Sequence, residues 1–345
     1  MRTLLLAASA ALALALPASA QEEPKGAPAP SEIVAAAPKS DWVAIPAEDL
    51  LVMTLAPDAE GKAREVVIQL MPAPFSQGWV HNIRLFARAK WYDGISVNRV
   101  QDNYVTQWGD PNYDNPEATG KAKPLPEGLK VMGEAEYVLQ LVQDQQLVER
   151  MGAIIRFGDR DLIGIEKATG IYGLDRDVYG ESAGMRDGWP VAMTTPDSPN
   201  DTYKLWPTHC YGMVGVGRNY SPDTGSGAEL YTVIGHAPRH LDRNIALVGR
   251  VIEGMQHLSS LPRGSGALGF YTAEESAKRT AILTVRVASD LPAAEQPAFE
   301  YLSTESTTFA TYAEAIANRR DPFFIVPAGG ADICNIRVPV RRVVP

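Results

Sequence analysis

Residues 92–111 read YDGISVNRVQDNYVTQWGDP, and this stretch decides the fold. It opens with an Asp-Gly turn and closes with a Gly-Asp-Pro turn, and the residues between are rich in β-branched and aromatic side chains that favour strands. Arg99 is a single cation inside this apolar run, and Gln107 follows eight residues later. Because side chains alternate between the two faces of a strand, Arg99, Val105 and Gln107 would share one face if the strand ran unbroken. Taken alone, Arg99 is typical of a solvated residue on an edge strand.

Strand and helix patterns flank this stretch on both sides. Residues 65–70 (EVVIQL) predict a strand, and an apolar stripe over 77–89 predicts a helix that Ser76 would cap. A second helix is expected near Val251. Further strands are expected over four segments, which are 211–218, 229–234, 245–249 and 281–288. Many short strands, few helices and Gly-rich turns favour a mainly β fold, either a barrel or a sandwich.

Two regions depart from this pattern. Between 112 and 210 the periodic segments are short and Gly, Pro, Asp and Asn are frequent, which predicts a long loop-rich insertion with one short strand at 136–139. After residue 289 the chain continues as a C-terminal extension over 290–345. A helix is expected there at 307–319 and a strand-like segment at 333–344.

The N-terminus carries the features of an export signal. Arg2 precedes an apolar core over 4–16, and Ala-Ser-Ala at 18–20 is a cleavage site, so residues 1–20 are interpreted as a signal peptide. Residues 21–40 are rich in Pro, Ala and charge and predict a flexible linker. The Ala-rich leader favours a periplasmic location, with secretion as the alternative. No later stretch reaches 18 uninterrupted apolar residues, so no membrane span is expected in the mature chain.

Composition excludes some partners and leaves other questions open. The formal net charge is −9, with 32 Lys and Arg against 41 Asp and Glu, and the cations are scattered. Nucleic-acid binding requires a clustered basic face, so it is not expected. Cys210 and Cys334 are the two cysteines, and the sequence leaves open whether they form a disulfide or remain buried thiols. The sequence does not indicate an oligomeric state.

Several motifs then occur in one order. Ala73-Pro74 precedes the predicted helix, the stretch 92–111 follows it, and His240-Leu241-Asp242 and 248–255 come later. This order resembles the cyclophilin-type peptidyl-prolyl cis-trans isomerases, over about 66–111 and 211–288. The resemblance implies a closed eight-stranded antiparallel barrel with two capping helices and a substrate groove on one outer face. It also implies one domain over 41–289, in which 112–210 is largely insertion.

The resemblance also implies roles for individual residues. Arg99 matches the catalytic arginine, Gln107 the amide that binds the substrate backbone, and Tyr231 an aromatic at the floor of the proline pocket. Glu229 and Ile245 depart from the family, which has Gln and often His at those positions. The implied substrate-binding set is Tyr104, Val105, Gln107, Glu229, Tyr231 and Ile245. No metal and no cofactor are implied.

The implied function is cis-trans isomerisation of X-Pro bonds in exported proteins, by non-covalent stabilisation of a twisted amide. Proline-containing polypeptides would be the substrates. The alternative is a catalytically weak or inactive periplasmic module that binds clients as a chaperone does. The replacement at Glu229 motivates this alternative, because a carboxylate there could pair with Arg99 and compete with substrate.

Two other motifs carry less weight. Residues 180–184 fit G-x-S-x-G, the nucleophile elbow of α/β-hydrolases, but no strand and helix are predicted around Ser182 as that elbow requires. The five histidines show no spacing typical of metal ligands, so solvated or capping roles are expected for them.

Overall fold

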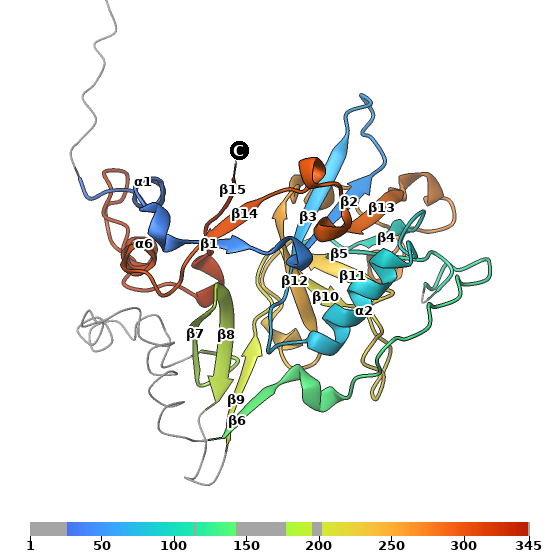
Figure 1. Ribbon diagram of the computed structural model, residues 1–345, viewed down its shortest axis with the longest axis horizontal. Helices are drawn as coiled ribbons and strands as arrows, with labels where there is room; N and C mark the ends of the chain where they lie inside the picture. Colours follow the sequence, from blue (N-terminus) through green and yellow to red (C-terminus); the bar gives the residue numbers. More distant parts are fainter. Residues whose placement is uncertain (1–25, 114, 143–176, 195–201, 344–345) are drawn as a thin grey trace, which may run out of the picture.

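The computed structural model describes residues 26–113, 115–142, 177–194 and 202–343. Eight antiparallel strands form its main sheet (Figure 1), in the order β13-β2-β3-β12-β10-β11-β5-β4. Their bounds are β2 Leu50–Leu55, β3 Arg64–Leu70, β4 Ser96–Val100, β5 Val105–Gly109, β10 Met213–Val216, β11 Leu230–Val233, β12 Leu247–Glu253 and β13 Ile282–Val287. The predicted signal peptide lies outside the described residues.

Hydrogen bonds between the two outermost strands close this sheet. The Ile282 amide donates to the Ile95 carbonyl (2.8 Å), and the Val97 amide donates to the Thr280 carbonyl (2.9 Å). A further bridge joins Ser96 to Ala281. Closure satisfies the backbone groups that an open edge would leave unpaired. The predicted closed eight-stranded barrel is therefore confirmed.

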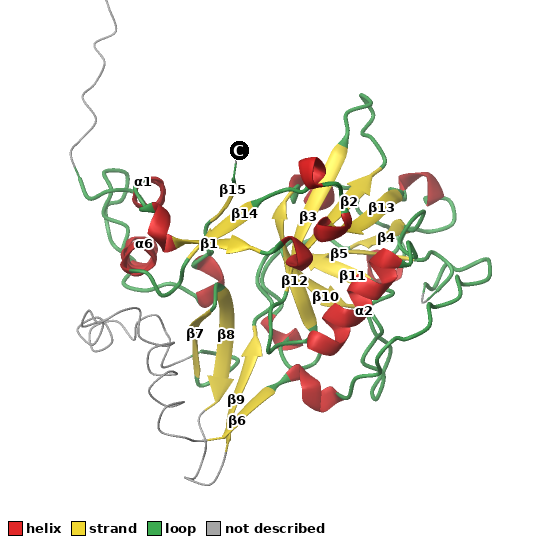
Figure 2. Ribbon diagram, in the orientation of Figure 1, coloured by secondary structure: helices red, strands yellow, loops and turns green. Residues whose placement is uncertain are grey.

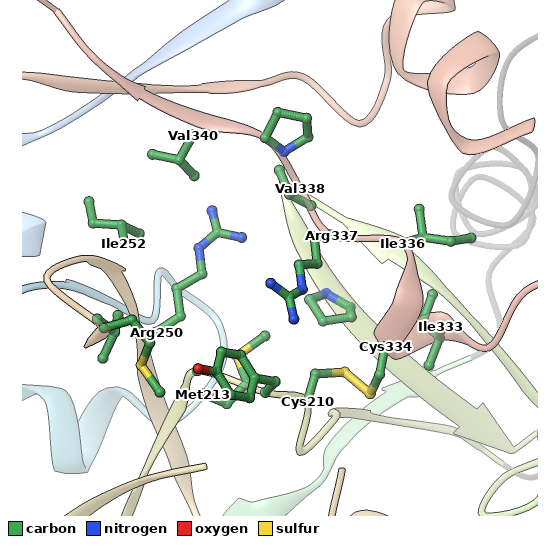
Figure 3. A pocket seen from close by; sticks show the side chains of 16 residues that line it. Cys210, Met213, Arg250, Ile252, Ile333, Cys334, Ile336, Arg337, Val338 and Val340 are labelled. Carbon is green, nitrogen blue, oxygen red and sulfur yellow. A yellow bond between two sulfur atoms is a disulfide. The ribbon is translucent and has the colours of Figure 1, made fainter. Parts of the chain in front are cut away.

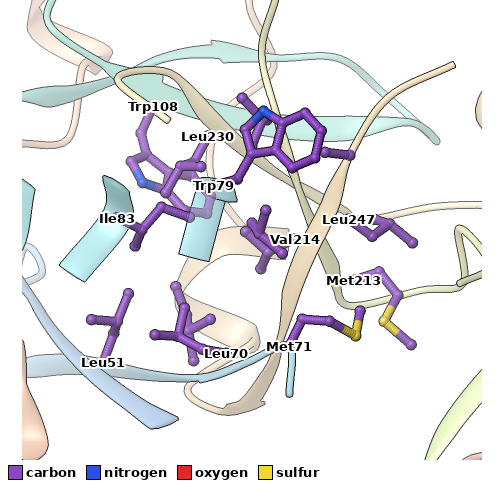
Figure 4. Packing of buried hydrophobic residues seen from close by; sticks show 14 of the residues in the cluster. Leu51, Leu70, Met71, Trp79, Ile83, Trp108, Met213, Val214, Leu230 and Leu247 are labelled. Carbon is purple, nitrogen blue, oxygen red and sulfur yellow. The ribbon is translucent and has the colours of Figure 1, made fainter. Parts of the chain in front are cut away.

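Helix α2 (Gln77–Arg88) covers one opening of the barrel and fills it with apolar side chains. Figure 4 shows Trp79 and Ile83 of this helix packed among Val214 and Leu230 of the barrel. The helix was predicted correctly, but its cap was not. Ser76 has left-handed backbone geometry (φ 54°) and makes no side-chain capping bond.

The second helix is shorter and later than predicted. Strand β12 runs through Val251 to Glu253, because it continues its pairing with β3 past the predicted end. One helical turn, α5 (Gln256–Ser259), follows and buries Leu258 completely. In β13 the register shifts after Ile282, and Leu283 is exposed although it alternates with the buried Val285 and Val287.

A second unit forms where loops and an extension were predicted (Figure 2). A four-stranded sheet has the order β6-β9-β8-β7, and a three-stranded sheet has the order β1-β14-β15. Their bounds are β6 Leu139–Val142, β7 Ser182–Arg186, β8 Trp189–Thr194, β9 Thr202–Pro207, β1 Trp42–Ile45, β14 Phe299–Leu302 and β15 Val340–Arg342. The described part of 112–210 is loop-rich up to residue 133, but it also contributes the four strands of the first of these sheets. The strand expected at 136–139 is a short 3-10 helix (Glu134–Tyr137) followed by β6.

The two added regions share one hydrophobic cluster. Trp206 of β9 and Ala192 of β8 pack with Phe309 and Tyr312 of helix α6 (Thr307–Ala317) and with Ile333. The helix at 307–319 is therefore confirmed. The strand-like pattern over 333–344 is only partly correct, since strand geometry is limited to β15.

The predicted linker is wrong over its described part. Residues 30–35 form helix α1 (Pro30–Ala35), which packs against α6. Ile33 and Val34 contact the apolar cluster of the second unit. The Pro and Ala content that suggested flexibility is also compatible with a short helix that begins with proline at its first position.

A disulfide joins Cys210 to Cys334 (S–S 2.00 Å) across 124 residues of sequence. It ties the C-terminal segment to the barrel. In the chain-entropy model, closing a loop of this length lowers the entropy of the unfolded chain and stabilises the folded protein by about 5 kcal/mol. Within the described residues, no helix is both long and apolar enough to cross a membrane.

Candidate active site

Three neighbouring strands bring Arg99, Gln107 and Tyr231 into one row across the barrel wall. Arg99 of β4 is opposite Gln107 of β5, and Gln107 is opposite Tyr231 of β11. Directly opposed residues project from the same face of a sheet. The unbroken strand considered from the sequence is wrong, because a turn at 101–104, with Asn103 at φ 51°, folds the segment into a hairpin.

The Arg99 guanidinium is held on several sides. Its Nε donates to the Leu268 carbonyl (2.7 Å), its Nη1 donates to Gln107 Oε1 (3.1 Å), and its Nη2 donates to the Gln101 carboxamide. Its Cζ lies over the ring of Tyr104 (5.7 Å to the ring centroid) and over the ring of Phe270 (5.5 Å). Burial lowers the pKa of Arg99, while its electrostatic interactions with Tyr104 and Tyr231 act in the opposite direction. Three of the five guanidinium N–H groups have partners among the described residues, which leaves two for a ligand.

Apolar side chains form the wall beside this cation. Val105, Tyr231 and Val233 are buried together, with Tyr104 and Ile245 packed against them. The groove that they share with Arg99 has a volume of about 700 Å³. It is lined by Arg99, Tyr104, Val105, Gln107, Tyr231 and Ile245 among others. Six of the seven residues implied by the resemblance therefore border one groove.

Glu229 is the seventh, and it lies beyond Gln107. Gln107 Nε2 donates to Glu229 Oε2 (3.4 Å), while Gln107 Oε1 accepts from Arg99. Glu229 is buried and borders a smaller neighbouring cavity, where Arg218 also lies. Gly109 leaves space for its carboxylate, because a Cβ at position 109 would overlap with it. Gln107 thus stands between the carboxylate and the arginine.

A chain of buried hydrogen bonds anchors the floor of the groove. Tyr231 Oη lies 2.9 Å from His209 Nε2, and His209 Nδ1 lies 2.8 Å from Asp242 Oδ1. Arg239 Nε donates to Asp242 Oδ2 (2.6 Å) and its Nη atoms bind Asp177. Because Asp242 only accepts, His209 carries its proton on Nδ1 and accepts the Tyr231 hydroxyl at Nε2.

The sequence did not predict this series of buried hydrogen bonds below Tyr231. His209 is fully buried, so the expected solvated or capping role is wrong for it. Gly215 provides room for the Tyr231 hydroxyl, since a Cβ there would overlap with Oη. Burial raises the pKa of Tyr231 well above its usual value, so the hydroxyl remains a donor. Phe270 and Leu268 were also missed, because the loop that carries them has no periodic pattern.

The protein is expected to lose stability as the pH falls below about 6.5, the usual pKa of a histidine in an unfolded chain. Burial lowers the pKa of His209, opposed by its hydrogen bond to Asp242. Below pH 6.5 the unfolded chain then binds more protons than the folded chain, so the free energy of unfolding decreases with decreasing pH. Urea unfolding at a series of pH values from 8 to 5 measures this slope.

The control for this prediction is a second histidine. His209→Gln should flatten the slope between pH 7 and 5, whereas His81→Gln, at an exposed position on α2, should retain it. An equal slope in wild type and His209→Gln would contradict the role given to His209.

The other sequence motifs do not form sites. Ser182 begins strand β7 and is followed by strand residues, so it is not on the strand-to-helix turn of a hydrolase elbow. Among the residues that the structure describes, no group of three or more His, Cys, Asp or Glu side chains could hold a metal ion.

Known proteins similar to this chain include the members of one family and a number of solved structures. The model of the family described as "Cyclophilin type peptidyl-prolyl cis-trans isomerase/CLD" matches residues 61–287. A cyclophilin from Hirschia baltica is 18% identical with a TM-score of 0.60, over 88% of this chain and 94% of that chain. A cyclophilin-type isomerase from Cryptosporidium parvum, crystallised with the dipeptide Ala-Pro, is 9% identical with a TM-score of 0.33, over 68% of this chain and 97% of that chain. No curated protein matches the sequence.

Proposed function

Because this chain belongs to the family of cyclophilin-type peptidyl-prolyl cis-trans isomerases, we propose that it accelerates the exchange of X-Pro bonds in exported polypeptides. The substrate would be any proline-containing segment extended enough to enter the groove beside Arg99. The proposal rests on one observation above all. The Arg99 guanidinium, which has two N–H groups without a partner among the described residues, borders an apolar wall in a groove of the size of a small ligand.

The reaction requires that the amide lose its planarity. Delocalisation of the nitrogen lone pair gives a rotation barrier of about 18–20 kcal/mol. In the twisted amide this lone pair is localised on the prolyl nitrogen, which becomes a better hydrogen-bond acceptor. An arginine N–H directed at this nitrogen stabilises the twisted state more than either planar isomer. No bond to the protein forms or breaks, so neither a nucleophile nor a metal is required.

The surrounding residues would supply position. Val105, Tyr231 and Ile245 would hold the proline ring in an apolar setting. Gln107 would hold the substrate backbone, and the stacking of Tyr104 and Phe270 on Arg99 would keep the guanidinium in one orientation. A fixed donor needs little reorganisation at the moment of rotation.

Export is part of the proposal. The leader at 1–20 and the Cys210–Cys334 disulfide both fit an oxidising compartment, and we assign the mature protein to the periplasm, with secretion as the alternative. Mass spectrometry of protein from the periplasmic fraction should find an N-terminus at Gln21. Recovery of intact Met1 in the cytoplasmic fraction would contradict this assignment.

A protease-coupled assay with a proline tetrapeptide tests the activity directly. The uncatalysed cis-to-trans conversion takes about tens to hundreds of seconds. Wild-type protein at micromolar concentration should make this conversion measurably faster. No increase would favour the alternative, a binding module. One observation favours that alternative: Gln107, which should bind substrate, already contacts Arg99 and Glu229 through its oxygen and its nitrogen.

Glu229→Gln is expected to raise kcat/KM about threefold, because hydrogen bonds to a charged acceptor are roughly twice as strong as neutral ones. The neutral side chain would release the Gln107 amide more readily to substrate. The same assay measures the effect, with Glu253→Gln as control, since Glu253 pairs with Arg342 away from the groove. An unchanged or lower kcat/KM would show that Glu229 does not restrain Gln107.

A further inference from the structure

A second cavity of about 400 Å³ lies between the barrel and the C-terminal segment (Figure 3). Strands β10 and β12 form one side, and residues 333–340 form the other. It shares no lining residue with the groove around Arg99. The disulfide between Cys210 and Cys334 is part of its wall.

Arg250 is the unusual residue of this cavity. Its side chain is buried (8% exposed), and it donates from Nε to Gln69 Oε1 (2.9 Å) and from Nη1 to the Gly188 carbonyl (2.8 Å). It also stacks on the ring of Trp189 (4.4 Å). Its Nη2 has no hydrogen-bond partner, and no carboxylate forms an ion pair with it, within the described part of the chain. Burial lowers the pKa of Arg250 to about 10.

A buried cation without an anion is costly, and proteins rarely retain one. Arg239, the other arginine that is buried in the described part of the chain, follows the rule, because it pairs with Asp177 and Asp242. Gln69 and the Gly188 carbonyl supply only dipoles to Arg250 and leave its charge uncompensated. An anion bound in the cavity would supply that compensation.

The rest of the lining indicates what kind of anion would fit. Arg337 is exposed and stacks on Tyr211 (4.9 Å), and Figure 3 shows its guanidinium and that of Arg250 pointing into the same space. The rest of the lining consists mostly of aliphatic and thioether side chains, among them Met213, Val251, Ile252, Met255, Ile333 and Val338. Two cations within apolar walls suit a molecule with one charged end and a hydrocarbon body.

We propose that this cavity binds a small organic carboxylate with a hydrocarbon chain, which places its carboxylate between Arg250 and Arg337. The planar fork of a guanidinium matches the two oxygens of a carboxylate. The hydrocarbon part lies against the aliphatic wall. Because the ligand contacts both β12 and residues 333–340, it holds the C-terminal segment on the barrel.

Isothermal titration with sodium octanoate tests this site in the full mature protein. Octanoate should bind with a stoichiometry of one, and Arg337→Gln should weaken it about tenfold, the cost of losing one hydrogen bond to a charged group. The matched control is Arg320→Gln, an exposed arginine that follows helix α6 in the C-terminal extension and does not line the cavity. Arg250→Gln should abolish binding. If the Arg250→Gln protein does not fold, the Arg337→Gln variant still tests the site.

Three further probes separate the proposed chemistry from simpler binding. Octanamide, which lacks the charge, should bind at least about tenfold more weakly than octanoate. Inorganic phosphate should not compete with octanoate, and Ile252→Phe should reduce binding while both arginines remain. The proposal is overturned if octanoate does not bind at millimolar concentration, if octanamide binds equally well, or if phosphate displaces octanoate.

Discussion

Arg99→Ala is expected to lower kcat/KM for a proline tetrapeptide by about 10²–10³-fold, the usual effect of removing one preorganised donor from a site that stabilises developing charge. The truncated side chain leaves Gln107 and the apolar wall in place, so substrate still binds but the twisted amide loses its donor. Stability should change little, by about 1 kcal/mol, because Arg99 is only partly buried and contacts groups that reach water.

Two further variants make this prediction specific to geometry. Arg99→Lys retains the charge but not the fork that contacts Leu268, Gln101 and Gln107 together, and should recover only a small part of the activity. Arg263→Ala removes another arginine, which pairs with Asp102 in the turn after β4 and does not line the groove, and should leave the rate unchanged. Equal turnover by wild type and Arg99→Ala would exclude Arg99 as the catalytic group.

The relation between Arg99 and Gln107 illustrates what the sequence could predict and how. A spacing of eight residues, an even number, would place both side chains on one face of a single strand, and they do share a face. The actual cause is the hairpin, in which the turn at 101–104 pairs the two residues across strands. A local sequence pattern predicts on which face of a strand a side chain lies. The register between two strands depends on the turn that joins them, and the turn residues between 100 and 105 were interpreted as part of the strand.

The anchoring of the groove floor could not be predicted in this way. His209 is 22 residues from Tyr231 and 33 residues from Asp242, and no periodicity links them. Histidine is intermediate in burial and aspartate is mostly exposed in proteins, so the burial of His209 and Asp242 follows only from their tertiary contacts. The same limit applies to the second unit, where Trp42 of β1 pairs with Leu302 of β14. Strands of four residues with distant partners leave too short a pattern to be recognised.

Asp242→Asn is expected to destabilise the protein by about 3–5 kcal/mol, the cost of breaking a buried ion pair by removing one partner. The Asp242 side chain is 1% exposed and accepts from Arg239 Nε and from both the backbone N and Nδ1 of His209. An amide can accept some of these bonds, but it cannot neutralise the guanidinium. Arg239 retains Asp177, so the loss should be near the lower end of this range.

The matched control is Asp290→Asn, the same substitution in an exposed pair. Asp290 binds Arg88, with 41% and 46% of the two side chains exposed, and water together with Glu48 can replace it. Its loss should cost less than about 1 kcal/mol. Urea unfolding at pH 7 measures both variants, and similar small losses would mean that the buried chain below Tyr231 contributes little. A large loss at Asp242 alone would instead identify this chain as the support that fixes the floor of the groove, since Tyr231 is held through His209 by that carboxylate.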